Sequence, residues 1–498
     1  MISRILLIDI DIFRNEDNSG SVYYSHHPVG LLYLISAART SFPEIDFNVF
    51  HTSTSKDPIK SIESLMLSFN PDLVGLRALS IATEPFKSVA EKIRELKPDI
   101  PIVGGGSYPS SSYNDILSAR LVDIVVIGEG ETTFVDLIGR LLKSTTIPTD
   151  LKGTAVIENG KVKVNELRPL IQNIDLLPFP DYNFIDLKDY IGIQNHALQD
   201  ASKSAFILSS RGCPYGCFYC HQLFGKKIRR RSAENVVAEM KEHIEKRGIY
   251  DFVFLDDVFN VPMADAKKLL SLITKELPAV RINFPNGLRA DQIDDEMLDL
   301  FESAGTVEMA LAVETVVPRL QKLIGKNLDI HKSEKAIQAA SKRFITRIFF
   351  IIGFPSETYK EALETIHFAA SFEYAAQPML SVLRIYNNSK LFNLLKPTKE
   401  QAIAMAAQEK KVIHLEMFDD IEFYGDLFPS EKVPLKSKDL KELLYFWMRD
   451  VFINADRIRK SHQVLEKHLD KEKILEFYRN VFNRPMYNER DLQKLLKS

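Results

Sequence analysis

The first 145 residues alternate short apolar runs with longer segments whose apolar positions recur at helical spacing. The runs RILLIDIDIF and IPIVGGG are typical of buried strands, whereas EPFKSVAEKIRELK carries one apolar and one polar face. Apolar strands that alternate with amphipathic helices favour a doubly wound parallel sheet. We therefore expect residues 1–145 to form an α/β domain with a Rossmann-like arrangement.

A second series of strands and helices begins near residue 203. Its predicted strands are SAFILSS, DFVFLDD, VRINFPNGLR, VEMALAVET, TRIFFIIGF and PMLSVLRIY. Helical segments such as ENVVAEMKEHIEKRG lie between them. These repeats predict a partial (β/α)6 barrel over residues 203–397, in which functional side chains gather at the C-terminal ends of the strands.

Two further regions complete the predicted organisation. Residues 146–202 contain a small hairpin that turns at Asn159 and Gly160, followed by a stretch rich in proline and aromatic residues. We expect this region to link the two α/β domains. Residues 398–498 lose the strand pattern, and we expect them to form a helical C-terminal domain.

The overall composition narrows the classes of function. The chain of 498 residues is 45% hydrophobic and 26% charged, and its net charge of -3 gives no basic face for nucleic acid. No apolar stretch approaches the roughly 18 residues that a membrane span needs. The N-terminal segment is not followed by the cleavage site of a signal peptide. We expect a cytoplasmic protein with no nucleic-acid partner and no membrane span.

The cysteines carry the sharpest chemical signal. The chain has only three, Cys213, Cys217 and Cys220, in the segment SSRGCPYGCFYCHQ just past the first strand of the second series. An odd, clustered set cannot form a disulfide framework and indicates a metal site or catalysis. Three thiolates on one short loop can hold three irons of a [4Fe–4S] cluster. The fourth iron is then open to the amino and carboxylate groups of S-adenosylmethionine, which one electron can cleave to a 5′-deoxyadenosyl radical.

Other sites fit parts of the same motif. Cys217, Cys220 and His221 match the C-x-x-C-H string of haem attachment, although no export signal accompanies them. The cysteines with His221 have the ligand types of a zinc site, although zinc sites usually pair two separated cysteine pairs. A third possibility is a set of inert thiols, which the clustering of every cysteine in one loop disfavours.

The motif and the segments after it resemble the radical S-adenosylmethionine (radical SAM) superfamily. The resemblance covers residues 203–390 and includes RRRSAENVVAEM, FLDDVF, NGLRAD, ALAVET and FFIIGFPSE in the family's order. It implies that Glu314 contacts the ribose hydroxyls and that Arg289 contacts the carboxylate. The positions that the resemblance assigns to S-adenosylmethionine are Tyr219, Asp256, Arg289, Glu314, Gly353, Pro355 and Glu357. Each also has a structural explanation, since strand-end carboxylates cap helices and Gly-Phe-Pro forms turns.

The N-terminal domain resembles that of the cobalamin-binding branch of the same superfamily. HPVGLLYLISAA, the glycine run after the fourth predicted strand and GEGET carry this resemblance. Glycines at strand ends let the backbone approach a ligand closely. The residues that the resemblance assigns to cobalamin are Gly30, Gly104, Gly105, Gly106, Ser107, Gly128, Glu129 and Gly130. A dinucleotide site is an alternative, but G-x-G-x-x-G does not follow the first strand, and a purely structural domain is another.

Two further features remain open. His27 and Gly30 have the spacing of the cobalt-ligand motif D-x-H-x-x-G, but Ser25 stands where that motif has the aspartate that orients the histidine. His27 is therefore a candidate lower ligand of cobalt. The basic run Lys226, Lys227, Arg229, Arg230 and Arg231 predicts either an anion site or a solvated face.

These features together predict a cobalamin-dependent radical SAM enzyme. The expected reaction is methylation of an unactivated carbon through methylcobalamin and a 5′-deoxyadenosyl radical. The alternatives are a radical rearrangement, cyclisation or oxidation without methyl transfer, and a cobalamin or iron–sulfur redox sensor. The expected partners are a small-molecule or peptide substrate and an external electron donor of the flavodoxin or ferredoxin kind. The sequence identifies no catalytic acid or base.

Overall fold

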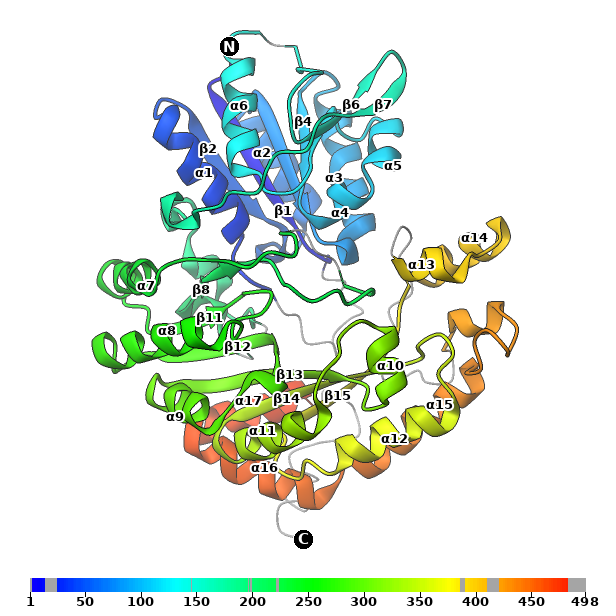
Figure 1. Cartoon of the computed structure of the whole chain (residues 1–498). Helices are drawn as coiled ribbons and strands as arrows, with labels where there is room; N and C mark the ends of the chain where they lie inside the picture. Colours follow the sequence, from blue (N-terminus) through cyan, green and yellow to red (C-terminus); the bar gives the residue numbers. More distant parts are fainter. Residues whose placement is uncertain are drawn as a thin grey trace. The chain divides into compact units, whose positions relative to one another are not determined.

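The computed structural model of the chain describes residues 2–13, 25–144, 146–195, 197, 199–220, 224–385, 390–409 and 421–481. The chain divides into two compact units, each with its own mainly parallel sheet (Figure 1). The first unit is Met1–Phe206 with His221–Arg231, and the second is Ile207–Cys220 with Ser232–Ser498. The cysteines therefore belong to the second unit, while the basic run after them belongs to the first.

A seven-stranded sheet with the order β2-β1-β3-β4-β5-β6-β7 forms the first unit. Its strands are β1 (Arg4–Ile10), β2 (Asp46–His51), β3 (Leu73–Ala78), β4 (Ile102–Gly105), β5 (Ile124–Val126), β6 (Thr154–Glu158) and β7 (Lys161–Val164). The first five strands pair in parallel. The strand order reverses at β1 and β3, and open α/β sheets bind ligands beyond the carboxyl ends of the strands at such a point.

Helices cover both faces of this sheet. They are α1 (Val29–Ser41), α2 (Pro58–Ser68), α3 (Thr83–Leu96), α4 (Ser107–Ser111), α5 (Tyr113–Ser118) and α6 (Glu131–Leu141). Ile5 and Leu7 of β1 belong to the core beneath α1 and α6, whereas Leu6 and Ile8 belong to the core beneath α2 and α3. Figure 1 draws α1 and α6 together. Because successive side chains of a strand point to opposite faces, an apolar run covered on both faces confirms the doubly wound arrangement.

The predicted hairpin is present at β6 and β7. Asn159 has φ +51° and Gly160 has φ +75°, as a two-residue hairpin turn requires. The pairing of β6 with β5 is antiparallel, so the hairpin extends the sheet of the first unit. The sequence predicts the turn but not this attachment, because the partner of an edge strand is set by distant residues.

A six-stranded sheet with the order β15-β14-β13-β12-β11-β8 organises the second unit. The strands are β8 (Ser204–Ile207), β11 (Asp251–Phe254), β12 (Arg281–Leu288), β13 (Thr306–Glu314), β14 (Ile345–Ile352) and β15 (Gln377–Val382). The pairs from β11 to β15 are parallel. All of these strands lie in the segments that the sequence predicts, which confirms the partial barrel.

The helices of the second unit alternate with its strands and then continue as a helical tail. Those between the strands are α7 (Ala233–Arg247), α8 (Met263–Glu276), α9 (Asp295–Ser303), α10 (Pro318–Leu323), α11 (Ile330–Arg343) and α12 (Tyr359–Ala370). Those of the tail are α13 (Lys390–Leu395), α14 (Lys399–Glu409), α15 (Ser437–Trp447), α16 (Ala455–His468) and α17 (Lys471–Val481). The C-terminal helices that the sequence predicts are confirmed.

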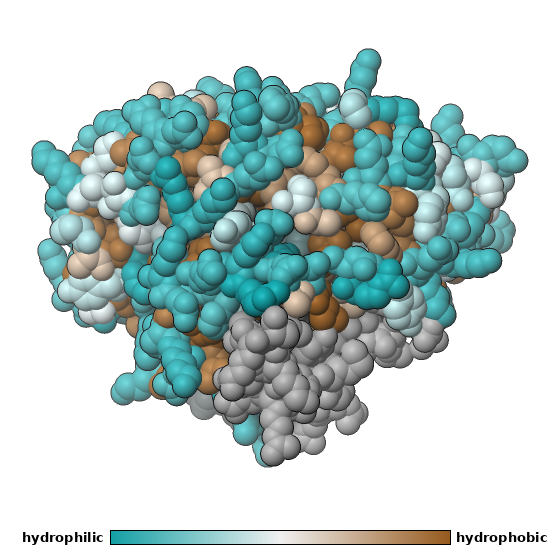
Figure 2. All heavy atoms as spheres, turned by 90° about the horizontal axis from the view of Figure 1, so that it is seen from below, coloured by the Kyte–Doolittle hydropathy of each residue, from teal (hydrophilic) through white to brown (hydrophobic). Residues whose placement is uncertain are grey.

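The surface is dominated by polar side chains on the face drawn in Figure 2, where apolar residues form small separate areas. Within the part of the chain that the structure describes, no helix has the length and apolarity needed to cross a bilayer. This agrees with the charged fraction of the sequence.

One buried arginine fastens the tail to the barrel. Arg457 of α16 is only 4% exposed. Its guanidinium donates to Ala375 O at 2.6 Å and Ala376 O at 3.0 Å, just before β15, and to Val451 O at 3.0 Å. Burial lowers the pKa of Arg457 to about 10, which leaves it charged at neutral pH. The backbone carbonyls thus take the place of a counter-ion.

We expect Arg457→Met to lower the free energy of unfolding by about 3 kcal/mol or more, because it leaves several buried carbonyls without donors. The control is Arg459→Met, two residues away, since Arg459 is 41% exposed and pairs with Asp456 at the surface. Urea titration followed by circular dichroism measures both changes. Equal stabilities of the two variants would contradict the role given to Arg457.

Candidate functional site

The three cysteines lie on the loop that follows the short strand β9 (Ser210–Arg211). Gly212 opens the loop with φ +94°, a conformation that favours glycine. Its N–H donates to Asp257 Oδ2 at 3.0 Å, beyond the end of β11. The N–H of Phe218 donates to Ile324 O at 3.1 Å, at the end of α10. The loop is therefore held at its start and in its middle by two different elements of the barrel.

Asp256, which the sequence predicts to lie near S-adenosylmethionine, faces the strand before this loop. Its carboxylate accepts hydrogen bonds from the Ser209 N–H at 3.2 Å and the Ser209 hydroxyl at 2.7 Å, and from the Ser210 hydroxyl. The residue is 2% exposed. Asp256 therefore positions the entry to the cysteine loop, and its direct contact with S-adenosylmethionine stays a prediction.

The three thiols lie near enough to one another to interact, since Cys217 and Cys213 both raise the pKa of the Cys220 thiol. Cys213 and Cys217 are half-buried and Cys220 is exposed. Removal from water raises the pKa of each thiol, so iron binding must displace their protons. Among the described residues, no three histidine, cysteine or acidic side chains converge on the position of a single metal ion. A cubane binds each cysteine to a different iron, so three cysteines leave the fourth iron without a cysteine.

A buried ion pair lies beside the loop at the end of β13. Glu314 ends the strand with φ +70°, after an irregularity in its pairing with β14. Lys326 Nζ lies 2.8 Å from Glu314 Oε1, and both side chains are less than one-tenth exposed. Burial raises the pKa of the Cys217 thiol, and the charge of Lys326 partly opposes this rise. A non-glycine residue held at positive φ is costly, and such strain concentrates at functional sites.

Lys326 is a site residue that sequence reasoning missed. It stands in a turn after a short helix, twelve positions beyond the carboxylate that it meets, and no motif marks it. The preceding Gly325 has φ +69°, and a Cβ there would lie 2.9 Å from Gly216 O of the cysteine loop. This close approach places the turn against the loop. In the sequence, the only trace of this role of Lys326 is the Gly325-Lys326 pair that follows the glutamate at the end of β13.

Arg289 is engaged within the protein. Its guanidinium donates to both oxygens of Asp291 at 2.9 Å, to Lys326 O at 2.7 Å and to Asn327 O at 3.1 Å. It also stacks on the Tyr215 ring at 3.8 Å from the centroid. Arg289 therefore fixes the turn that carries Lys326 against the cysteine loop. The prediction that it contacts the carboxylate of S-adenosylmethionine stays a prediction.

The segment after β14 forms a tight turn capped by its own glutamate. Glu357 Oε2 accepts from the Gly353 N–H at 2.5 Å and the Phe354 N–H at 3.0 Å, and the side chain is fully buried. Gly353 has φ +91°, and Pro355 is half-buried in the turn. Tyr219 lies with its ring 6.2 Å from that of Phe354. Glu357 thus shapes the turn, and Tyr219 brings the cysteine loop towards it.

In the first unit, glycines gather after β4 and β5, where the sequence predicts them. At Gly30, Gly105 and Gly128 a Cβ would meet no atom within 4 Å, so these positions leave room for a ligand. Gly104 and Gly130 are explained by packing, because a Cβ at Gly130 would lie 2.9 Å from Leu34 and one at Gly104 3.3 Å from Pro109. Gly106 has φ +88°, and Ser107 begins α4 directly after it. Room beyond strand ends fits cobalamin.

Glu129 is engaged in a buried ion pair. Arg229 Nη1 lies 2.8 Å and 2.7 Å from the two oxygens of Glu129, and the Ile171 N–H donates to Oε2 at 2.8 Å. The two side chains are only 5% and 2% exposed. Glu129 therefore anchors the segment after the cysteine loop to the first unit, and its contact with cobalamin stays a prediction.

The basic run does not form one surface. Lys226 and Lys227 are exposed, but Arg229 is buried in the ion pair above. Arg231 is 8% exposed and stacks over the Phe179 ring at 5.2 Å. Of the two interpretations of the run, a solvated face is wrong for Arg229 and Arg231, because each is buried against an internal partner.

His27 lies in an aromatic enclosure. It is 1% exposed, and its ring lies 4.5 Å from Tyr190, 4.7 Å from Phe206 and 5.5 Å from Tyr182 between centroids. A metal ligand needs a ring nitrogen that the metal can reach. In this enclosure the imidazole packs as an aromatic residue, and cobalt ligation stays a prediction.

A buried polar cluster that the sequence did not indicate lies at the carboxyl ends of β1, β2 and β3. Asp9 pairs with Arg77 at 2.8 Å. His51 contacts the Tyr190 hydroxyl at 3.1 Å through Nδ1 and the Ser53 hydroxyl at 3.0 Å through Nε2. Burial lowers the pKa of His51 and favours its neutral form. Polar side chains therefore line the place between β1 and β3 at which the strand order reverses.

Comparison with known proteins agrees with both halves of this description. A family model of the Radical SAM superfamily matches residues 207–369, and one of the B12 binding domain matches residues 17–138. "Uncharacterized methyltransferase PH0819" of Pyrococcus horikoshii is 30% identical over 352 residues, which cover 70% of this chain and 73% of that protein.

Two more distant proteins extend the comparison. The anaerobic magnesium-protoporphyrin IX monomethyl ester cyclase of Rubrivivax gelatinosus is 26% identical, over 62% of this chain and 56% of its own length. The radical S-adenosylmethionine methyltransferase TsrM of Kitasatospora setae, solved with cobalamin and a [4Fe–4S] cluster, matches 80% of this chain and 75% of its own. Its TM-score of 0.63 at 18% identity shows a shared fold.

The buried carboxyl group of Glu357, in the turn after β14, predicts that the stability of the protein depends on pH. Burial raises the pKa of Glu357 from 4.5 to about 8. Between these values the folded protein keeps a proton that the unfolded chain has lost, so rising pH favours unfolding. We expect Glu357→Gln to gain stability relative to the unaltered protein between pH 5 and pH 8, by at most about 1.4 kcal/mol per pH unit.

Chemical denaturation at several pH values measures this difference. Glu364→Gln is the matched control, since Glu364 is exposed on α12. A difference between Glu357→Gln and the unaltered protein that stays constant over the whole range would contradict the buried, protonated carboxyl.

Proposed function

Since the chain belongs to the cobalamin-binding radical SAM family, we propose that it methylates an unactivated carbon of its substrate. The chain is a cobalamin-dependent radical SAM enzyme with a [4Fe–4S] cluster. The methyltransferase named among its relatives, 30% identical over 70% of this chain, supports the transfer of a methyl group.

Different residues of the second unit would hold the cluster and the separate parts of S-adenosylmethionine. Cys213, Cys217 and Cys220 would hold the cluster, which when bound supplies the electron that releases a 5′-deoxyadenosyl radical from S-adenosylmethionine. Lys326 offers a buried positive charge beside the loop, so it would hold the carboxylate of S-adenosylmethionine. Glu314 would accept hydrogen bonds from the ribose hydroxyls. The turn from Gly353 to Glu357 would lie along the adenine.

The first unit would hold cobalamin at the carboxyl edge of its sheet, with the backbone at Gly105 and Gly128 facing open space. The bound cobalamin would carry the methyl group. An external one-electron donor of the flavodoxin or ferredoxin kind would reduce the cluster, as low-potential clusters require.

A second candidate is a radical oxidation or cyclisation without methyl transfer. The relative from Rubrivivax gelatinosus, a cyclase that is 26% identical over 62% of this chain, favours it. The two candidates share the cluster, the cofactors and the first radical step. They differ in whether the substrate gains a methyl group.

Product mass separates the two candidates. We expect protein reconstituted without oxygen, with cobalamin, a reductant and S-adenosylmethionine that carries a deuterated methyl group, to release 5′-deoxyadenosine and S-adenosylhomocysteine. A product from a cell extract should gain the label. A product that loses hydrogen and carries no label would overturn the methyl transfer and support the second candidate.

The control for this assay is Cys220→Ala. Loss of one thiolate should prevent assembly of the cluster and abolish release of 5′-deoxyadenosine. Unchanged release by this variant would count against the cluster itself.

Lys326 gives a second test of the same site. We expect Lys326→Met to weaken binding of S-adenosylmethionine by about ten-fold or more, because a charge-assisted contact is lost. Lys326→Arg should restore part of the affinity. Calorimetry with the cluster-loaded protein measures the dissociation constant, and Lys322→Met, exposed on α10, is the control. Equal affinities for Lys326→Met and the control would remove Lys326 from the site.

A further inference from the structure

One buried arginine lies directly against the loop that carries the cysteines. Tyr215 stands between Cys213 and Cys217, and the guanidinium of Arg289 lies 3.8 Å from the centroid of its ring. The same guanidinium donates to Lys326 O at 2.7 Å, in the turn that also approaches the loop. All of these residues belong to the second unit. A positive charge is therefore held beside the thiols that bind the cluster.

The charge of Arg289 acts on two of these thiols. Burial raises the pKa of the Cys213 thiol and of the Cys217 thiol, and the positive charge of Arg289 opposes the rise at both. A positive charge that favours a thiolate also favours extra negative charge on a cluster bound to the same sulfur atoms, because both effects are Coulombic. Such an effect is stronger at a buried site than in water, because the surroundings screen it less.

Asp291 holds this charge in a fixed direction. Its carboxylate oxygens accept from Nε and Nη2 of Arg289 at 2.9 Å each, and both side chains are only 6% exposed. Burial raises the pKa of Tyr215, and of the two charges that of Arg289 acts more strongly on this hydroxyl than that of Asp291. The ion pair therefore has its positive end towards the cysteine loop and its negative end behind it.

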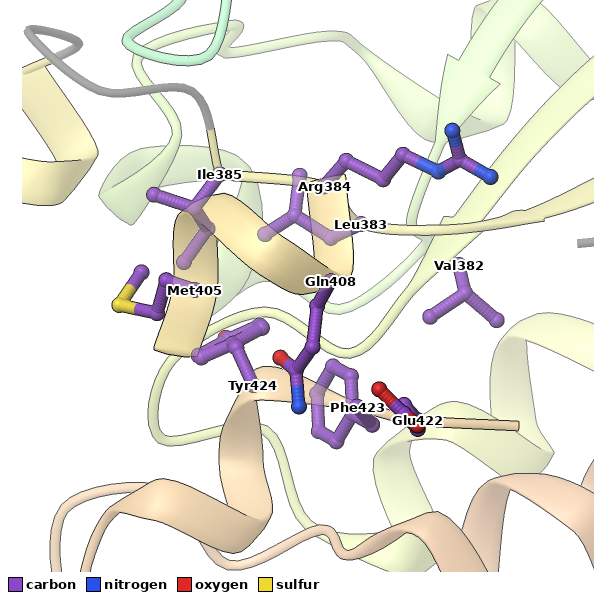
Figure 3. Close-up of a pocket in the computed structure, with 9 residues that line it drawn as sticks. All are labelled: Val382, Leu383, Arg384, Ile385, Met405, Gln408, Glu422, Phe423 and Tyr424. Carbon is purple, nitrogen blue, oxygen red and sulfur yellow. The ribbon is translucent and has the colours of Figure 1, made fainter. Parts of the chain in front are cut away.

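Arg384 is another arginine at the carboxyl end of a barrel strand, but its surroundings differ. It follows β15, which lies three positions from β12 in the sheet. It is half-buried and lines the pocket drawn in Figure 3, where its guanidinium points away from Gln408 and Glu422. Of these two arginines, Arg289 is the one that is buried, fixed by a carboxylate and stacked on the cysteine loop.

We infer that Arg289, held by Asp291 and stacked on Tyr215, raises the reduction potential of the [4Fe–4S] cluster. The inference rests on the cluster and holds for either of the two candidate reactions. When an external one-electron donor reduces the cluster, the donor loses one electron and the cluster gains one negative charge. Arg289 stabilises the reduced state more than the oxidised state, because the reduced state carries more negative charge. Asp291 is a positioning residue that acts through Arg289.

The midpoint potential of the cluster tests this inference. Cluster-loaded, full-length protein is titrated with dithionite and redox mediators, without oxygen and without S-adenosylmethionine, and the reduced cluster is followed by electron paramagnetic resonance. We expect Arg289→Met to lower the potential by about 59 mV or more, which is a ten-fold loss in the equilibrium constant for adding one electron. We expect Asp291→Asn to raise the potential, because the charge of Arg289 then lacks its counter-ion.

A second arginine–aspartate pair on the same strand is the matched control. Arg281 begins β12, whereas Arg289 follows its end, and Arg281 Nε donates to Asp251 Oδ1 at 2.9 Å. The eight residues of β12 separate the two arginines by about 25 Å at the usual rise of a strand. Solvent and salt screen a charge over such a distance. Arg281→Met and Asp251→Asn should therefore leave the midpoint potential unchanged.

Iron content and circular dichroism establish that each variant is folded and carries a complete cluster. If Arg289→Met does not assemble a cluster, the sign of the shift in Asp291→Asn decides the question, because that change keeps the shape of the side chain. A potential that is unchanged or higher in Arg289→Met, or unchanged or lower in Asp291→Asn, would overturn the inference. An equal shift in Arg281→Met would overturn it too. None of these outcomes depends on whether the substrate gains a methyl group.

Discussion

The number of cysteine thiolates on one loop determines which ligands the iron–sulfur cluster of this protein can have. A [4Fe–4S] cluster has four irons, but the chain has only three cysteines, Cys213, Cys217 and Cys220. One iron must therefore be bound by ligands other than cysteine. Two hydrogen bonds fix that loop, one from the Gly212 N–H to Asp257 and one from the Phe218 N–H to Ile324 O. A loop fixed in this way keeps its thiols in position before a cluster arrives, which lowers the entropy lost on binding.

Around the loop, buried charge is arranged in pairs. Glu314 meets Lys326, and Arg289 meets Asp291 while stacking on Tyr215. Paired charges can be buried where single ones cannot. One of these pairs, Glu314 with Lys326, lies beside the loop and combines a carboxylate with an ammonium. In the proposed function, Lys326 would hold the carboxylate of S-adenosylmethionine and Glu314 would accept hydrogen bonds from its ribose hydroxyls.

The sequence allowed much of this to be predicted because the relevant signals are local. The barrel strands β8 and β11 to β15 are apolar runs with turn residues between them, and the hairpin at Asn159 and Gly160 needs only two residues of positive φ. The cysteine motif is equally local. The resemblance to the radical SAM superfamily then identified the motifs that follow the cysteines along the chain.

The remaining features depend on contacts between distant residues, and no local pattern records them. Glu129 meets Arg229 one hundred positions away, so a residue assigned to cobalamin turns out to anchor a segment. Arg289, which the resemblance places at the carboxylate of S-adenosylmethionine, also donates to Asp291 and to the carbonyls of Lys326 and Asn327. Lys326 lacked any motif, since its role follows from the turn that places it against the cysteine loop.

The most direct test of the account is whether S-adenosylmethionine binds the cluster itself. Reduced, cluster-loaded protein can be mixed with S-adenosylmethionine labelled with ¹⁵N in the amino group and studied by electron–nuclear double resonance. The account predicts a hyperfine coupling between that nitrogen and the cluster, and its loss on chelation of the iron. A cluster signal that is unchanged by S-adenosylmethionine and shows no coupling would contradict it.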